Sequence, residues 1–409
     1  MTLGRLLLGW LLAALAGAAM GQVAPPALPG ATLQSLLDWA RQHSPELAAM
    51  QYEAQAAEQR VGAAGALSDP RFKMELQDLS RMGEQSPTVL PGRVGATVYS
   101  VTQELPWSGK RALQRDIASL DAQANAARAV QGWSELRARI KTAYVQRYLA
   151  HSTQQLVQEN LDLMLQLEKV MQVRYAGALA AQQDITRIHV EHTGMRADLV
   201  ALGAAERQAL ARLNAALARP WDAALAGPTD LPALPAPGQL GFAALAARLQ
   251  QSNAQLLGEQ ARLRSAEKAR DLGYAARYPD FTFGMIATQR QSDLKEWGLM
   301  LEVNLPLRDT VLGARERDAE AMLAAAQARQ EATRNQLLAD LSDQLIALEA
   351  ARQTEHLMVF SLLPQAELTW QAALTGYENG KGDFSMLLDA QRQIHAAHLG
   401  QLRAQVDAQ

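Results

Sequence analysis

Four stretches of the chain alternate apolar and polar residues with the period of two that is typical of β-strands. They lie at residues 71–78, 94–105, 281–288 and 297–305. In the first, RFKMELQ, Phe72 and Met74 share one face while Lys73 lies on the other. Polar loops join the first stretch to the second and the third to the fourth. The pattern therefore predicts four strands in two hairpins.

Strands of roughly ten residues are long enough to cross a bilayer within a barrel. Soluble hairpins packed on helices would show the same alternation, so the pattern leaves both structures open. Four strands cannot close a barrel, and a lipid-facing sheet cannot keep unpaired edges. If the strands span a membrane, several chains must share one barrel, and three chains would supply twelve strands.

Elsewhere the apolar residues recur with helical spacing. Two very long runs cover about 67 residues each, and a continuous helix of that length is about 100 Å long. Within the first run, Leu113, Ile117 and Leu120 follow the spacing of four and three that is typical of coiled coils. The predicted helices are two opening helices (33–67 and 242–276), the two long helices (108–175 and 309–377) and two return helices (182–218 and 384–409).

The order of helix, hairpin, long helix, glycine-containing bend and return helix occurs twice, in units of about 200 residues. Pro70 aligns with Pro279, and Tyr175 aligns with Tyr377. A Pro-rich segment separates the two copies. The predicted organisation is a signal peptide (1–21), a first repeat (22–217), a connector (218–240) and a second repeat (241–409).

The N-terminal segment MTLGRLLLGWLLAALAGAAMGQ has the form of a secretory signal peptide. Arg5 supplies a positive charge, an apolar core follows, and Ala19 and Gly21 supply small residues for cleavage. We expect residues 1–21 to be removed on export. The apolar core is short for a membrane anchor, and no later run of about 18 apolar residues predicts a transmembrane helix.

Composition excludes several functional classes. Aromatic residues make up only 5% of the chain, against 48% for all apolar types, which favours long helices with small residues at their contacts. The formal net charge of −3 and the lack of a basic stripe argue against nucleic-acid binding. The absence of cysteine excludes disulfides, Cys-ligated zinc and a lipidated N-terminal Cys. No triad, carboxylate pair or cofactor motif argues for an enzyme.

Together these features resemble the TolC family of outer-membrane efflux channels. The resemblance covers essentially all of the mature chain. It rests on the repeat, on SPEL, DPRF and YPDF before the strands, on LPWSGK and NLPL after them, and on the LLDAQ segment beside the second bend. The segments ELPWSGKR and LLPQAE are most similar to the heavy-metal-efflux (CusC/CzcC-like) branch.

The resemblance implies a mainly helical trimer with a β-barrel part. Four strands from each chain would form a shared twelve-stranded barrel in outer-membrane lipid, and the long helices would form a periplasmic α-barrel. The implied partners are two further copies of the chain, a periplasmic adaptor (membrane fusion) protein and an inner-membrane RND pump. The strand-to-helix junctions would lie at Pro70, Pro106, Pro279 and Pro306.

The resemblance also implies a gate at the periplasmic mouth. Asp389 matches an acidic position that forms a constriction ring, and Tyr377 and Asp184 match a contact that holds the closed state. Three carboxylates around one axis would repel one another and attract cations. A second acidic position of the family is Met386 here. A solvated surface position for Asp389, and chance proximity for the Tyr–Asp pair, remain the alternatives.

The glycine-containing bends are the predicted tips of the helical tunnel and the predicted adaptor contacts. TGYENGKGDF could be a phosphate-binding loop, but such a loop follows a strand, whereas this one joins two helices. An arginine of the family's second tip is replaced here by glycine, and a neighbouring lysine could supply its charge. The tip residues are Tyr175, Gly177, Ala178, Gly380, Lys381 and Gly382.

Two histidine pairs follow the bends, His189 with His192 and His395 with His398. A three-residue step places each pair on one helix face, a geometry used in metal ligation. Ordinary polar helix positions are the more common explanation for such pairs, so no metal site is predicted.

The favoured hypothesis is an outer-membrane exit duct of a tripartite efflux system, which would export heavy-metal cations or other toxic compounds. A rival hypothesis is a soluble periplasmic coiled-coil scaffold or adaptor that keeps the helices and treats the strands as a small soluble domain. A third hypothesis, a metal-dependent periplasmic enzyme, rests on the histidines alone.

Overall fold

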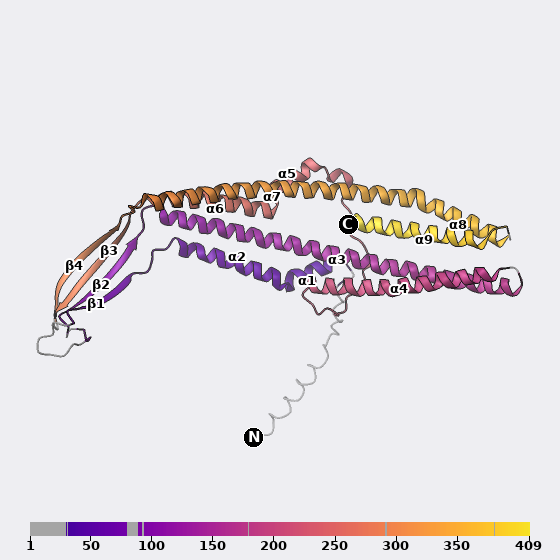
Figure 1. The fold of residues 1–409 in the computed structure, drawn as a ribbon, viewed down its shortest axis with the longest axis horizontal. Helices are drawn as coiled ribbons and strands as arrows, with labels where there is room; N and C mark the ends of the chain where they lie inside the picture. The colour runs from indigo at the N-terminus through magenta and orange to yellow at the C-terminus, as the bar shows by residue number, and fades with distance from the viewer. Residues whose placement is uncertain are drawn as a thin grey trace, which may run out of the picture. The chain divides into compact units, whose positions relative to one another are not determined.

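The computed structural model describes residues 30, 32–79, 89–91, 94–178, 180–290, 293–379 and 381–409. The predicted signal peptide and Gly380 lie outside this part of the chain. In chain order the elements are α1 (Leu33–His43), α2 (Pro45–Ala64), β1 (Arg71–Gln77), β2 (Ala96–Leu105), α3 (Lys110–Ala176), α4 (Gln182–Ala216), η1 (Pro237–Gln239), α5 (Phe242–Ser252), α6 (Ala254–Ala275), β3 (Asp280–Arg290), β4 (Asp293–Asn304), α7 (Asp309–Leu357), the π-helix η2 (Met358–Leu362), α8 (Leu363–Glu378) and α9 (Phe384–Asp407) (Figure 1).

The chain forms two compact units, and each takes segments from both sequence repeats. One unit comprises Met1–Ser44, Arg137–Leu234 and Ala350–Gln409, and it contains α4, α8 and α9. The other comprises Pro45–Leu136 and Pro235–Glu349, and it contains all four strands. The two sequence repeats therefore do not correspond to the two compact units. The long helices α3 and α7 contribute residues to both units.

The opening helix of each repeat differs from the single helix expected from the sequence, because each is broken in two. Ser44 separates α1 from α2 with extended backbone angles, as expected for a residue before proline. Asn253 separates α5 from α6, and its side chain accepts a hydrogen bond from the Leu256 amide at 3.1 Å. Asn253 is thus the N-cap of α6, a role for which asparagine is strongly preferred.

The second long helix is also interrupted, between Leu357 and Leu363. Here the Leu363 amide donates to the Met358 carbonyl five residues earlier, which is the π-helical pattern. Pro364 follows directly and lacks an amide hydrogen. The wider turn fits a helix that must continue through a residue unable to make the ordinary bond.

The four strands form one antiparallel sheet in the order β1-β2-β3-β4 (Figure 1). The two predicted hairpins are present, and the pairing of β2 with β3 joins them into a single sheet. Within the described residues β1 pairs only with β2, and β4 pairs only with β3. The sheet therefore has two edges that no strand of the same chain covers.

The predicted alternation gives the sheet one apolar face that is exposed to solvent. Phe72, Val101, Met285 and Leu299 are neighbours in register across the four strands. Their exposed fractions are 68%, 49%, 52% and 90%. The adjacent row on the other face is Lys73, Ser100, Ile286 and Gly298, of which Ile286 alone is large and apolar. A row of large apolar side chains this exposed is unusual in a soluble monomer.

The strand ends lie beside the predicted prolines, and one ion pair joins the two repeats there. Pro70 and Pro279 precede β1 and β3, whereas Pro106 and Pro306 follow β2 and β4. The Lys110 Nζ donates to the Asp280 carboxylate and to the Tyr278 carbonyl, both at 2.8 Å.

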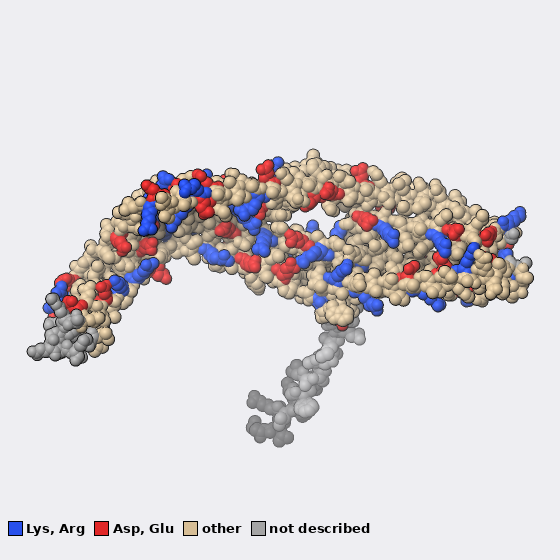
Figure 2. Space-filling model, in the orientation of Figure 1, with Lys and Arg blue, Asp and Glu red and all other residues tan. Residues whose placement is uncertain are grey.

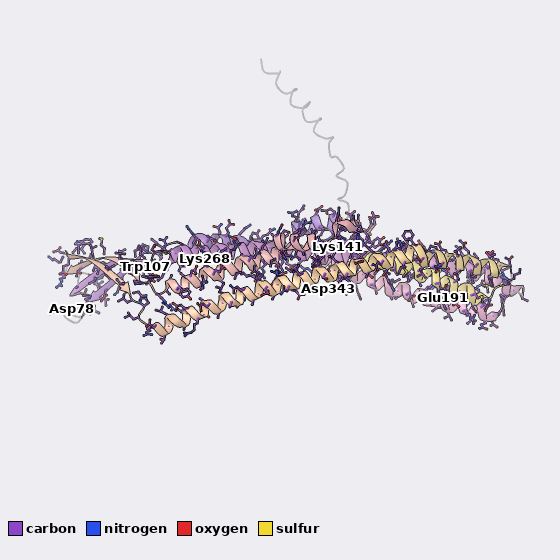
Figure 3. All side chains as sticks on the ribbon, turned by 90° about the horizontal axis from the view of Figure 1, so that it is seen from above. Asp78, Trp107, Lys141, Glu191, Lys268 and Asp343 are labelled. Atoms are coloured by element: carbon purple, nitrogen blue, oxygen red, sulfur yellow. The ribbon has the colours of Figure 1, made fainter. Side chains whose placement is uncertain are left out.

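Trp107 completes this junction (Figure 3). Its amide donates to the Asp280 carboxylate at 2.8 Å, and its ring stacks on Tyr278 with centroids 5.2 Å apart. The LPWSGK motif of one repeat and the YPDF motif of the other thus meet at the base of the sheet. These contacts explain why the two motifs, which both contributed to the family resemblance, occur together in one chain.

The unit that contains the helical bends has its own hydrophobic core. Met171 of α3 and Ile188 of α4 are fully buried together with Phe384 and Leu387 of α9. The α3–α4 hairpin therefore packs against the α8–α9 hairpin. Over the visible face, acidic and basic side chains are intermixed along the helices, in line with the near-neutral net charge (Figure 2). Among the described helices, none has both the length and the hydropathy needed to span a membrane.

We predict that Asp280→Ala weakens the junction. The change leaves the Lys110 ammonium, whose side chain is 11% exposed, and the Trp107 amide without their shared acceptor. The expected loss is about 1–3 kcal/mol of folding free energy, the usual cost of unpaired buried donors. Thermal unfolding of the purified protein in detergent measures it. Asp293→Ala, which removes an exposed ion pair with Lys295, is the control and should change little. An equal effect of both substitutions would contradict the role assigned to the junction.

Candidate functional site: the helical tips

The α3–α4 tip turns through a left-handed residue. Ala178 has φ 56°, a value that favours glycine, and its amide donates to the Tyr175 carbonyl at 3.0 Å. Gly177 lies one position earlier, and its amide donates to the Val173 carbonyl at 3.2 Å. Gly177 therefore lies one residue before Ala178, the position whose left-handed backbone favours glycine. Tyr175, Gly177 and Ala178 are all exposed at the tip.

The α8–α9 tip depends on a close approach of two backbone segments. The amides of Lys381 and Gly382 both donate to the Gly376 carbonyl, at 3.0 and 2.9 Å. A Cβ atom at Gly382 would lie 2.9 Å from the Tyr377 nitrogen, so a larger residue cannot fit without a shift of the turn. Asp383 then caps α9 by accepting a hydrogen bond from the Ser385 amide. The glycine that replaces the family's arginine is thus required by the turn itself. Lys381 remains exposed.

Tyr377 is buried between the two hairpins. The Arg174 guanidinium lies 4.6 Å from the centre of its ring, and Phe384 packs edge-on at 5.8 Å. Its hydroxyl donates to the Met171 sulfur, and not to Asp184 as the resemblance implies. Burial raises the pKa of the Tyr377 hydroxyl, and the nearby charge of Asp184 raises it further, although Arg174 acts against this.

Arg174 was not singled out from the sequence. A basic residue in the last turn of a long helix is a common stabilising feature. Its partner Tyr377 is far away in the chain, so the cation–π contact has no local signal.

Asp389 lies on the exposed side of α9, with 65% of its side chain exposed. Arg392, one turn later, places its Nη1 3.6 Å from the Asp389 carboxylate. The same guanidinium is held more closely by Glu191 of α4, where Nη2 and Nε donate to one oxygen at 2.6 and 3.2 Å. The predicted acidic position therefore has a nearby arginine, which the sequence analysis did not identify.

Asp389 opens onto a groove between α4 and α9. Arg187 of α4 crosses this groove and donates to the Ser385 hydroxyl. The groove is lined at helical spacing by Gln183, Thr186, Arg187 and Val190 from α4 and by Ser385, Leu388, Asp389 and Arg392 from α9. Contacts between the two hairpins thus include arginine side chains from both helices.

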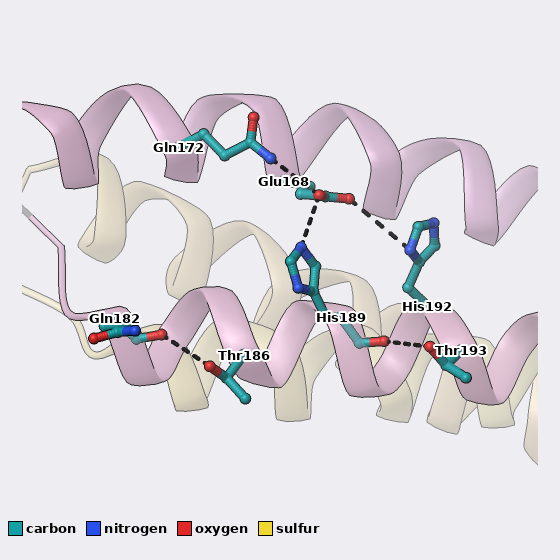
Figure 4. Close-up of polar contacts among 7 residues, drawn as sticks. All are labelled: Glu168, Gln172, Gln182, Thr186, His189, His192 and Thr193. Carbon is teal, nitrogen blue, oxygen red and sulfur yellow. Dashed lines mark hydrogen bonds and ion pairs between the residues drawn. The ribbon is translucent and has the colours of Figure 1, made fainter.

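The first histidine pair shares one carboxylate of the facing helix (Figure 4). His189 Nε2 lies 2.9 Å from one oxygen of Glu168, and His192 Nδ1 lies 3.9 Å from the other. Gln172 donates to the same carboxylate at 3.1 Å. The carboxylate therefore joins α3 and α4 within the first hairpin.

The second pair lies half-buried on α9. Burial lowers the pKa of His395, and the neighbouring His398 lowers it further, whereas Asp198 and Glu191 of α4 act in the opposite direction. Across the described residues, no group of three or more histidine and carboxylate side chains has a geometry that could hold a metal ion.

Comparisons with known proteins agree with this architecture. Residues 245–409 match the family model described as outer membrane efflux protein. No curated protein sequence matches significantly.

Solved structures match over most of the chain. VceC, an outer membrane protein of Vibrio cholerae, superimposes with a TM-score of 0.77 at 18% identity, over 92% of this chain and 93% of VceC. The MtrE outer membrane channel of Neisseria gonorrhoeae in its open state matches with a TM-score of 0.75 at 17% identity, over 93% and 87% of the two chains. CusC matches with a TM-score of 0.77 at 15% identity, over 92% and 90%.

These identities do not single out CusC, so the match gives the heavy-metal branch only weak support. The family model, which matches residues 245–409, supports the predicted relation to the TolC-like outer membrane efflux proteins. The structural matches cover most of the chain and show that its fold is that of these channels.

Proposed function

We propose that three copies of this chain form a passive exit duct in the outer membrane for a tripartite efflux system. The strands of the three copies would close a twelve-stranded barrel, and the long helices would form the periplasmic tunnel. A periplasmic adaptor and an inner-membrane RND pump would complete the pathway, with the pump supplying the energy. The duct would export heavy-metal cations or other toxic compounds and would carry out no enzymatic reaction.

The exposed apolar face of the sheet is the observation that carries this proposal. Large apolar side chains from all four strands lie side by side on that face, and the other face is richer in small and polar residues. Such a sheet suits lipid on one side and a water-filled lumen on the other. The free edges of β1 and β4 can be satisfied in lipid only by strands of neighbouring copies.

This observation also favours the duct over a soluble scaffold. A soluble scaffold would have to cover Phe72, Met285 and Leu299, whose exposed fractions are 68%, 52% and 90%. Within each compact unit, the described contacts provide no such cover. The sheet therefore needs lipid or another chain.

The helical tips are proposed as the periplasmic mouth and its docking surface. Asp389 would form an acidic ring at the three-fold axis, and Tyr377 with the nearby Asp184 would help to hold the closed state, together with the bond of the Tyr377 hydroxyl to Met171. Tyr377 already lies buried between the hairpins, so its contacts must change if the hairpins separate. The adaptor would contact Tyr175, Gly177, Ala178, Lys381, Gly382 and Gly380, the last of which lies outside the described residues.

We predict that Leu299→Arg prevents assembly in the outer membrane. Leu299 is the most exposed residue of the apolar face, and an arginine at the middle of a bilayer costs about 2–4 kcal/mol at a lipid-facing barrel position. Met300→Arg is the matched control, because the adjacent position of β4 belongs to the other face and should tolerate a charge. The measurement is the amount of trimer extracted by detergent from outer-membrane fractions.

Release of the unmodified protein by osmotic shock without detergent would contradict the proposed location. Equal loss of trimer in both variants would contradict the assignment of the two faces.

We predict that Asp389→Ala raises single-channel conductance and weakens block by divalent cations. The substitution removes the exposed carboxylate that would attract cations at the mouth. Recordings of the purified trimer in planar bilayers, with Mg²⁺ added on the tip side, measure both quantities. Asp407→Ala, at the far end of α9, is the control. Unchanged conductance and block would remove Asp389 from the gate.

A further inference from the structure

Arg392 lies between two carboxylates that differ in burial and in position. Glu191, on α4, has a side chain that is 18% exposed and accepts two hydrogen bonds from Arg392, at 2.6 and 3.2 Å. Asp389, on α9, is 65% exposed and lies 3.6 Å from the guanidinium. The raised pKa of Arg392 has the Glu191 hydrogen bond as its largest cause. In this structure Arg392 is therefore hydrogen-bonded to Glu191 and forms a longer ion pair with Asp389.

The two neighbours of Arg392 respond differently to a movement of α9 away from α4. Glu191 is on the facing helix and lies near the tip of its hairpin (Figure 3), so separation of the helices breaks its contact with Arg392. Asp389 is on the same helix, three residues earlier, and moves together with Arg392. Charged side chains at this spacing on one helix can pair with each other. Release from Glu191 therefore leaves Arg392 beside a carboxylate that has no closer partner among the described residues.

We infer that Arg392 is a positioning residue that exchanges carboxylates when the mouth opens. With the hairpins together, Glu191 takes the hydrogen bonds of Arg392, and the Asp389 carboxylate is compensated only by the longer ion pair. With the hairpins apart, Arg392 pairs with Asp389 and neutralises it. The mouth is then more acidic when closed than when open. This inference rests on the proposed function, in which Asp389 faces the passage.

The surrounding charges are consistent with this exchange. The other guanidinium that lines the groove belongs to Arg187, which is engaged by the Ser385 hydroxyl. His395 follows Arg392 by one turn, and burial lowers its pKa, so it carries little positive charge at neutral pH. Asp198 and Glu191 face His395 from α4. Arg392 is therefore the cation placed to compensate Asp389.

Two substitutions that remove the same ion pair should act in opposite directions. Glu191→Gln frees Arg392 to pair with Asp389, so block by Mg²⁺ from the tip side should weaken. Arg392→Gln leaves Asp389 without its compensating charge, so block should strengthen. The half-blocking Mg²⁺ concentration should shift by roughly two- to five-fold each way, the range expected for a partly exposed ion pair.

A simple latch makes a different prediction, because loss of the pair loosens the same contact in both variants. Block would then shift in the same direction for Glu191→Gln and Arg392→Gln. Such a result, or no shift in either variant, would overturn the exchange.

Three further variants complete the experiment in planar bilayers. Glu168→Gln is the matched control, since its side chain is 16% exposed and its histidine contacts lie within the α3–α4 hairpin, so Mg²⁺ block should not change. Adding Glu191→Gln to Asp389→Asn should weaken block no further than Asp389→Asn alone, because the two act through one carboxylate. Arg392→Lys keeps the positive charge without the paired hydrogen bonds, so the Mg²⁺ block of this variant should lie between that of the wild type and that of Arg392→Gln. Arg392→Lys also tests the inference if Arg392→Gln does not form trimers.

Failure of the inference and failure of the proposed function give different results. Wild-type trimers that carry no current would contradict the duct itself. Wild-type trimers that conduct and are blocked by Mg²⁺, with parallel shifts in Glu191→Gln and Arg392→Gln, would contradict only the exchange.

Discussion

Backbone hydrogen bonding at the two edges of the sheet is the constraint on which the rest of the structure depends. A strand in lipid must pair on both sides, because no water is available to its free amides and carbonyls. β1 and β4 are each paired on one side within the chain, and the apolar face between them is exposed. In the proposed duct, the need for partner copies follows from those two edges and requires no motif.

The same constraint explains why the two repeats are tied so firmly at the base of the sheet. In the proposed barrel, a sheet that joins neighbouring copies needs a fixed register between β2 and β3, which come from different copies of the repeat. Asp280 accepts from the Trp107 amide and from Lys110, so the end of β2 and the start of β3 are held by one carboxylate. The junction thus sets the register of the pairing that makes the sheet continuous.

How much the sequence could predict depended on how local each signal was. The strands were predicted because alternation is visible within seven residues, as in the run from Arg71 to Gln77. The helix breaks at Ser44 and Asn253 had local signals, a following proline and a capping side chain, which the overall helical spacing hid. The π-helix has a local signal in Pro364, but it also depends on a distant contact. Met358 packs against Gly400 of α9, where an added Cβ would lie 3.0 Å from the Met358 sulfur. That contact depends on the packing of α9, as do the partners of Tyr377 and Arg392.

The contrast between the two tips suggests how a gate can work with few charges. Gly382 is fixed by the approach of its backbone to Gly376, so this position cannot also carry an arginine that latches the hairpins. Met386 leaves Asp389 as the acid that remains of the two positions implied by the resemblance. In the proposed gate, the bond between Glu191 and Arg392 farther along the helices adds to the contacts that hold the hairpins together. Because Arg392 also lies 3.6 Å from Asp389, in the proposed duct a contact that holds the hairpins together would also control the charge at the mouth.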